Sequence, residues 1–169
     1  MILVEADVSE EWDSSTDWAQ LALAAVRAAV AQSDVRGLLD GGPAAEVSVK
    51  FTSDDEVRSL NADWRGKDKA TNVLSFPMIE PDQLASLARA ADGEALLGDI
   101  VLAHGICSAE AVAKGVATCT HAAHLVVHGT LHLLGLDHET GEGEAEAMEA
   151  AERRALAGLG IADPYEMHR

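Results

Sequence analysis

The sequence lacks the long apolar segments and cysteine pairs that mark membrane and secreted proteins. No apolar run approaches the roughly 18 residues of a membrane-spanning helix, and the longest, 21–26, belongs to an amphipathic pattern. Two cysteines, Cys107 and Cys119, are too few for a disulfide scaffold. The first four residues contain no base and are followed at once by acids, so we expect no secretory signal and a cytoplasmic protein.

Positive charge is also scarce. Twelve Lys and Arg residues face 29 Asp and Glu residues, which gives a formal net charge of −17. A protein that coats nucleic acid must neutralise many phosphates, so this balance argues against one. Any contact with nucleic acid must be local, and the bases do gather in one segment: Lys50, Arg58, Arg65, Lys67 and Lys69.

The length of 169 residues and the mixed patterning predict one α+β domain over residues 1–169. Apolar residues alternate in strand fashion over 2–8, 47–51, 72–76 and 97–103. Helical spacing or capping signals occur over 15–29, 54–62, 82–91, 107–114, 116–134 and 143–159, the first with Ser14 or Ser15 as its cap. We therefore expect a small mixed sheet of about four strands packed with about five to six helices.

The strongest chemical signal is a cluster of histidines, since five of the seven lie between 121 and 138. His128 and His132 are four residues apart, so on a helix their side chains lie one above the other and close enough to share a metal ion. Gly135 then allows the helix to end and His138 to turn back toward them. This spacing is that of the long zincin signature, in which three imidazoles hold zinc and leave one position open.

One position departs from the zinc peptidases. They carry a glutamate directly after the first histidine as general base, whereas this chain has Gly129. Glycine is unfavourable inside a helix. We therefore expect that Gly129 leaves room beside the metal for a phosphate group and so contributes to substrate binding.

Residues 128–138, HGTLHLLGLDH, carry a family resemblance. The segment resembles the HGxLHLxGYDH motif of the bacterial YbeY family of ribosomal-RNA maturation endoribonucleases. The likeness extends through residues 61–77, NADWRGKDKATNVLSFP, through LGDI at 97–100 and through DPY at 163–165. Three positions differ from the common pattern of the family: Trp64, Asn72 and Leu136.

The resemblance implies a zincin-like sheet, one Zn²⁺ per chain and cleavage of single-stranded RNA. It further implies a role in maturing the 3′ end of the small-subunit (16S) ribosomal RNA, in ribosome assembly and in quality control. The expected partners are precursor rRNA and components of the small ribosomal subunit. The acidic surface suggests that such partners, more than general affinity for RNA, direct the protein to its substrate.

Basic residues and a further histidine are candidates for substrate binding and proton transfer. A guanidinium suits phosphate, so Arg65 is expected to bind substrate and to stabilise the transition state, with a structural salt bridge as its alternative. Lys67 and Lys69 would steer RNA toward the site. His124, one helical turn before the first ligand, is a candidate proton carrier. Zinc-bound hydroxide and the RNA 2′-OH remain alternatives for the missing base.

Two other function classes stay open. The ligand spacing also fits a zinc-dependent peptidase or amidase, and a ribosome-assembly factor with purely structural zinc would carry the same motif. Asp137, directly before the third predicted ligand, is a candidate for orienting a ligand imidazole. The acidic residues of the last helix, Glu152 among them, are expected on a solvated face with Met148 and Leu156 inward, and His121 is expected to face solvent.

Overall fold

The computed structural model of the chain describes residues 1–136 and 142–164. These residues form a four-stranded sheet packed with helices, so the predicted α+β class is confirmed. The elements follow in the order β1 (Ile2–Val8), α1 (Trp18–Ala31), η1 (Arg36–Asp40), β2 (Ala44–Thr52), α2 (Asp54–Arg65), β3 (Val73–Pro77), α3 (Pro81–Arg89), β4 (Glu94–Ala103), α4 (His104–Lys114), α5 (Thr118–Leu133) and α6 (Glu142–Gly158).

The sheet has the strand order β1-β2-β4-β3. Strands β1 and β4 run parallel to β2, whereas β3 runs antiparallel to β4 and forms an edge. In the register of the sheet, Ile100 of β4 lies between Val49 of β2 and Ser75 of β3. The short edge strand β3 thus leads the chain from the end of α2 back along β4.

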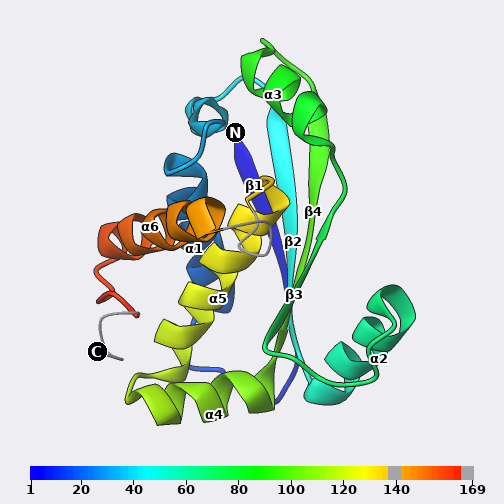
Figure 1. The fold of residues 1–169 in the computed structure, drawn as a ribbon, viewed down its shortest axis with the longest axis vertical. Helices are drawn as coiled ribbons and strands as arrows, with labels where there is room; N and C mark the ends of the chain where they lie inside the picture. The colour runs from blue at the N-terminus through cyan, green and yellow to red at the C-terminus, as the bar shows by residue number, and fades with distance from the viewer. Residues whose placement is uncertain (137–141, 165–169) are drawn as a thin grey trace.

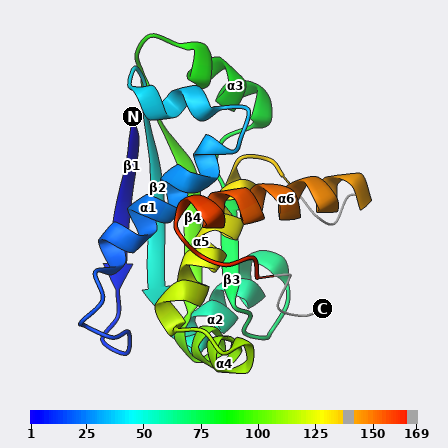
Figure 2. The ribbon, with the colours of Figure 1, turned by 90° about the vertical axis from the view of Figure 1, so that its left-hand side faces the viewer.

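Helices α1 and α5 cover one face of the sheet and α6 packs on these two helices, whereas α2 lies at one end of the opposite face (Figures 1 and 2). The alternation within β2 explains this layering. Val47, Val49 and Phe51 are at most 1% exposed and belong to the main hydrophobic core, whereas Ser48 and Lys50 between them are half-buried on the other face. The polar side of the sheet therefore carries little helical cover.

The ends of α1 and α2 differ in part from the sequence prediction. The cap of α1 is Asp17, whose side chain accepts the backbone N–H of Gln20 at 3.1 Å, and not Ser14 or Ser15. Ser53 caps α2 as predicted, through the N–H of Glu56. The capping signals covered 54–62, with the helix expected to end near residues 64–66, and α2 does end at Arg65, so Arg65 occupies its last turn.

Helix α5 carries the histidines and is buried along most of its length. It ends at Leu133 because Gly135 takes φ +96°, a left-handed conformation that disfavours other residues. The N–H of Leu136 then donates to the carbonyl of Leu131 at 3.0 Å and closes the turn. The predicted end of this helix is confirmed.

Two predictions of solvent exposure were wrong. His121 is only 3% exposed, and Glu152 on α6 is only 1% exposed. Glu152 faces α5, on which α6 packs (Figure 2), and His121 faces Glu110 of α4. Within the described residues, no helix is long and apolar enough to span a bilayer.

Candidate metal and RNA site

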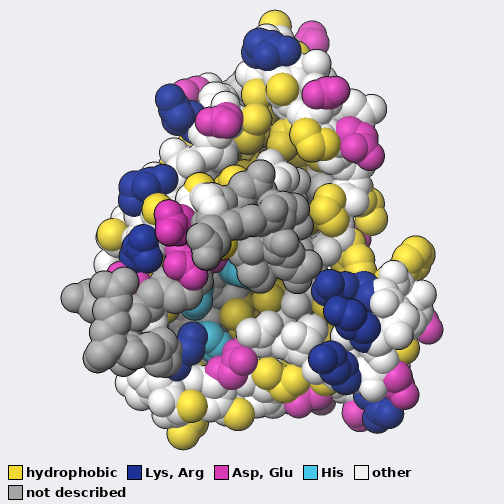
Figure 3. All heavy atoms as spheres, viewed as in Figure 1, with side chains coloured by type: hydrophobic (Ala, Val, Ile, Leu, Met, Phe, Trp, Pro, Cys, Tyr) yellow, Lys and Arg dark blue, Asp and Glu magenta, His cyan; other side chains and the backbone are white. Residues whose placement is uncertain are grey.

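A surface cavity of about 730 Å³ brings the predicted metal ligands and the predicted phosphate ligand together. Its wall includes Arg65 from α2, His128 and His132 from α5, and Asn72 and Ser75 from the segment that leads into and through β3. In Figure 3, histidine side chains lie in a hollow of the surface, with a group of Lys and Arg side chains to one side. The arrangement joins residues that are far apart in the sequence.

The two predicted histidine ligands, His128 and His132, face each other. The Nε2 atoms of His128 and His132 lie 3.1 Å apart, and their ring centroids are 4.7 Å apart. Two imidazoles that share a tetrahedral zinc at roughly 2.0–2.1 Å would place their nitrogens about 3.4 Å apart. The separation therefore suits two nitrogens that ligate one ion.

The third predicted ligand, His138, and the neighbouring Asp137 lie outside the described residues. Within residues 1–136 and 142–164, no group of three His, Cys, Asp or Glu side chains is placed to hold a metal. The described part of the chain therefore supplies two of the three predicted ligands.

Behind the predicted ligands lies the carboxylate of Glu152, which the sequence had placed on a solvated face. Glu152 Oε1 contacts His128 Nδ1 at 2.5 Å, and its Oε2 contacts His124 Nε2 at 3.0 Å. The spacing in the sequence indicated that Glu152 is buried, because Glu152 is four residues from both Met148 and Leu156, which were expected to face inward. On one helical face these three residues must share the same environment.

His124 does not line the cavity that contains Arg65, because its Nε2 turns toward Glu152. It lines a smaller cavity of about 220 Å³ together with Asn72, Glu110 and His121. His124 thus has no direct access to the larger cavity, which does not favour its predicted role as a proton carrier to the substrate. Its position is that of a residue behind His128.

A second carboxylate–histidine pair lies beside the first. His121 Nε2 contacts Glu110 Oε1 at 2.8 Å, and the amide of Asn72 donates to the same oxygen at 3.0 Å. Burial lowers the pKa of His121 and outweighs the opposing effect of Glu110. Burial by itself raises the pKa of Glu110, but the hydrogen bonds from His121 and Asn72 lower it overall. A neutral imidazole therefore donates to an ionised carboxylate, and Asn72, where the family pattern has Asp, adds no second negative charge.

The basic side chains occupy the end of α2 and the loop after it. Arg65, Lys67 and Lys69 are exposed, and only Arg65 lines the cavity. The loop is fixed by the amide of Asn61, which donates to the Lys69 carbonyl at 2.9 Å, and by a salt bridge between Arg58 and Asp68. Among the described residues, Arg65 takes part in no salt bridge, which does not favour the alternative of a structural ion pair.

Gly129 does not provide the space that we expected. It is buried, it does not line the cavity, and a Cβ atom at this position would lie 3.0 Å from Cγ2 of Ile100. The missing side chain thus allows α5 to pack closely on β4. The prediction that Gly129 makes room for phosphate was therefore wrong, and the glycine serves helix–sheet packing instead.

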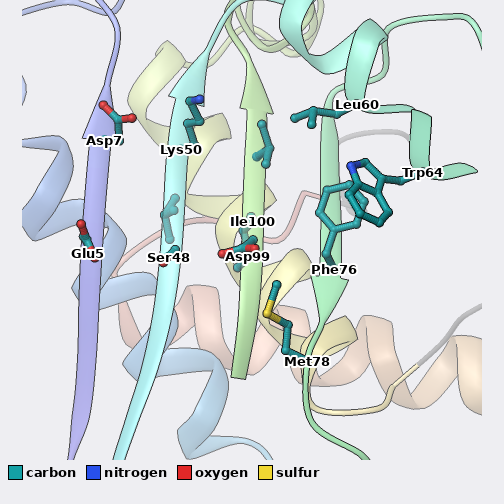
Figure 4. Close-up of a pocket in the computed structure, with 12 residues that line it drawn as sticks. Glu5, Asp7, Ser48, Lys50, Leu60, Trp64, Phe76, Met78, Asp99 and Ile100 are labelled. Carbon is teal, nitrogen blue, oxygen red and sulfur yellow. The ribbon is translucent and has the colours of Figure 1, made fainter. Parts of the chain in front are cut away.

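The opposite, open face of the sheet holds another cavity, of about 440 Å³ (Figure 4). Glu5, Asp7, Lys50 and Asp99 point from the strands into it, and Trp64 of α2, 74% exposed, borders it. None of the predicted metal or phosphate ligands among the described residues lines this cavity. The candidate site therefore lies on the side of the sheet where α5 packs.

A solved structure shares this fold. The solution structure of TM1509 from Thermotoga maritima superposes with a TM-score of 0.55 and covers 95% of this chain and 92% of its own. The sequence identity is 22%, so the likeness concerns the fold alone.

Sequence comparisons give the family. The family model described as Endoribonuclease YbeY matches residues 6–160. A protein of that name from Rhizorhabdus wittichii is 54% identical over 165 residues, which cover 98% of this chain and 97% of the relative. Another from Sphingopyxis alaskensis is 53% identical and covers 98% of both chains. This chain therefore belongs to the YbeY family of endoribonucleases.

Proposed function

We propose that this protein is a zinc-dependent endoribonuclease that cuts single-stranded RNA while the 3′ end of 16S ribosomal RNA matures. Family membership supports a hydrolase that cleaves internal phosphodiester bonds of RNA. It does not favour the alternative peptidase. We further propose that residues 1–169 act as one catalytic domain in the cytoplasm, with precursor rRNA and components of the small ribosomal subunit as partners. The two free cysteines are compatible with a reducing compartment.

One observation carries the proposal: Arg65 of α2 and the two histidines of α5 line the same cavity. A guanidinium binds phosphate oxygens through paired N–H donors and keeps its charge at all relevant pH values. The imidazoles present nitrogen ligands to a metal on the other part of the wall. A phosphodiester bound in this cavity would thus lie between a fixed positive charge and a metal site.

The residues present fit a zinc ion. His128, His132 and, by our proposal, His138 would hold it, since the Nε2 atoms of the first two already lie 3.1 Å apart. When bound, zinc supplies a Lewis acid and a water of lowered pKa. Three protein ligands leave the fourth position for that water or for substrate, which favours catalytic over structural zinc.

Basic side chains of the protein would bind and orient the RNA. Arg65 would bind a non-bridging phosphate oxygen and stabilise the additional negative charge of the transition state. Lys67 and Lys69, exposed on the adjoining loop, would attract the RNA backbone toward the cavity. Since the net charge of −17 repels RNA elsewhere, this local group would favour binding in one orientation.

The test combines metal analysis with cleavage assays. The purified protein should contain about one zinc per chain and should cut a single-stranded RNA but neither a duplex RNA nor casein. His132→Ala should lose zinc and activity together, and added zinc should restore the activity of protein treated with a chelator. Cleavage of RNA at the wild-type rate by metal-free protein would refute the proposed metal dependence. Cleavage of casein but not RNA would favour the peptidase, and stoichiometric zinc without either activity would favour the assembly factor.

A further inference from the structure

We propose that Glu152 is the positioning residue of the metal site: its carboxylate sets the ring orientation and the protonated nitrogen of His128. This inference rests on the proposed function, in which His128 binds the metal. It concerns a residue of α6, an element that contributes nothing to the wall of the cavity among the described residues.

The burial of Glu152 requires an explanation. Its side chain is 1% exposed and lies on the apolar side of α6 with Met148 and Leu156, which are fully buried. A carboxylate in such surroundings is strongly unfavourable unless hydrogen-bond donors compensate it. Both of its oxygens contact imidazoles of α5, so the histidine cluster contributes to the compensation.

The contact with His128 fixes the state of that ring. In the proposed arrangement the Nδ1–H of His128 donates to Oε1 of Glu152, 2.5 Å away, because carboxylate oxygens are hydrogen-bond acceptors. The lone pair of Nε2 is then available, and Nε2 is the atom that faces His132. Histidines that bind metals usually donate their other N–H to such an acceptor, which also makes the ligand more basic.

The second oxygen holds the carboxylate itself in place. Oε2 contacts His124 Nε2 at 3.0 Å, and His124 lies one helical turn before His128. With each oxygen engaged by a different ring, the carboxyl group cannot rotate without breaking a contact. Since Glu152 does not line the cavity, it acts on the metal through His128 and does not touch substrate.

Competition with a chromophoric chelator measures the zinc affinity of the 169-residue protein. Glu152→Gln keeps the shape of the side chain but removes its charge. Glu146→Gln, an exposed position on the same helix, makes the same chemical change elsewhere. We expect zinc affinity to fall about 10- to 100-fold in Glu152→Gln and to change less than about twofold in Glu146→Gln.

A measurement on the unmodified protein keeps the test decisive if Glu152→Gln fails to fold. In metal-free wild-type protein, long-range ¹H–¹⁵N correlation spectra should show His128 protonated on Nδ1 and not on Nε2. A proton on Nε2 of His128, or equal zinc affinity in the wild type and folded Glu152→Gln, would overturn the role of Glu152. A wild-type protein that binds no zinc would instead refute the proposed metal site itself.

Discussion

Replacing Gly129 by alanine tests whether this glycine serves the packing of α5 on the sheet. Alanine adds one Cβ atom, which would lie 3.0 Å from Cγ2, 3.3 Å from Cγ1 and 3.4 Å from Cδ1 of Ile100. Ile100 is fully buried in β4, with β2 on one side and β3 on the other. The isoleucine therefore has little freedom to move away.

The expected change in the free energy of unfolding for Gly129→Ala combines two opposing effects. Alanine is favoured over glycine in a helix by about 1 kcal/mol. Overpacking a dense core costs roughly 1–3 kcal/mol. Gly129→Ala should therefore destabilise the wild-type protein by about 0–2 kcal/mol. In an Ile100→Ala background, where all three contacting atoms are gone, the same change should instead stabilise the protein by about 1 kcal/mol.

The assay is a double-mutant cycle in urea, with the free energy of unfolding measured for wild type, both single variants and the double variant. The coupling energy isolates the contact from the helix propensity, which is the same in both backgrounds. We expect a coupling of about 1–3 kcal/mol, equal to the overpacking cost. A coupling below about 0.5 kcal/mol, within the scatter of independent sites, would refute the packing argument.

Three further predictions concern other parts of the molecule. Arg65→Glu should lower the rate of RNA cleavage by about 10³-fold, with a free energy of unfolding within about 0.5 kcal/mol of wild type because the residue is exposed; a large loss of stability would point to a structural role. Burial raises the pKa of the Cys107 thiol to about 12, so iodoacetamide at pH 8 should leave Cys107 unmodified in native protein, as read by mass spectrometry, and fast native labelling would contradict its burial. The hydrogen bond from Lys50 lowers the pKa of Glu56 below its ordinary 4.5, so the pair stabilises the fold above that pH and the benefit disappears as the pH falls through the lowered value. Because the two side chains are 42% and 37% exposed, the free energy of unfolding of wild type should exceed that of Glu56→Gln by less than about 1 kcal/mol at pH 7, and a difference that grows toward pH 3 would show the sign to be wrong.

The sequence by itself determined the elements and the chemistry of the motif. Alternating apolar residues specified four strands, and their side-chain period of two also separated the core face from the polar face. The spacing of His128 and His132 determined that they would meet, because a helix places residues four apart on one side. Gly135 determined where that helix would end, since its backbone takes φ +96°. All of these are local properties, which act over a few residues.

Only the tertiary structure decided which distant residues share a site. The antiparallel return of β3 beside β4 brings the end of α2, with Arg65, to the cavity of α5. The packing of α6 on α5 turned Glu152 from an expected solvated residue into a buried partner of His128. Likewise, contact with Ile100 gave Gly129 a packing role in place of the expected substrate role. These outcomes depend on how helices and strands meet, which a local pattern of residues does not specify.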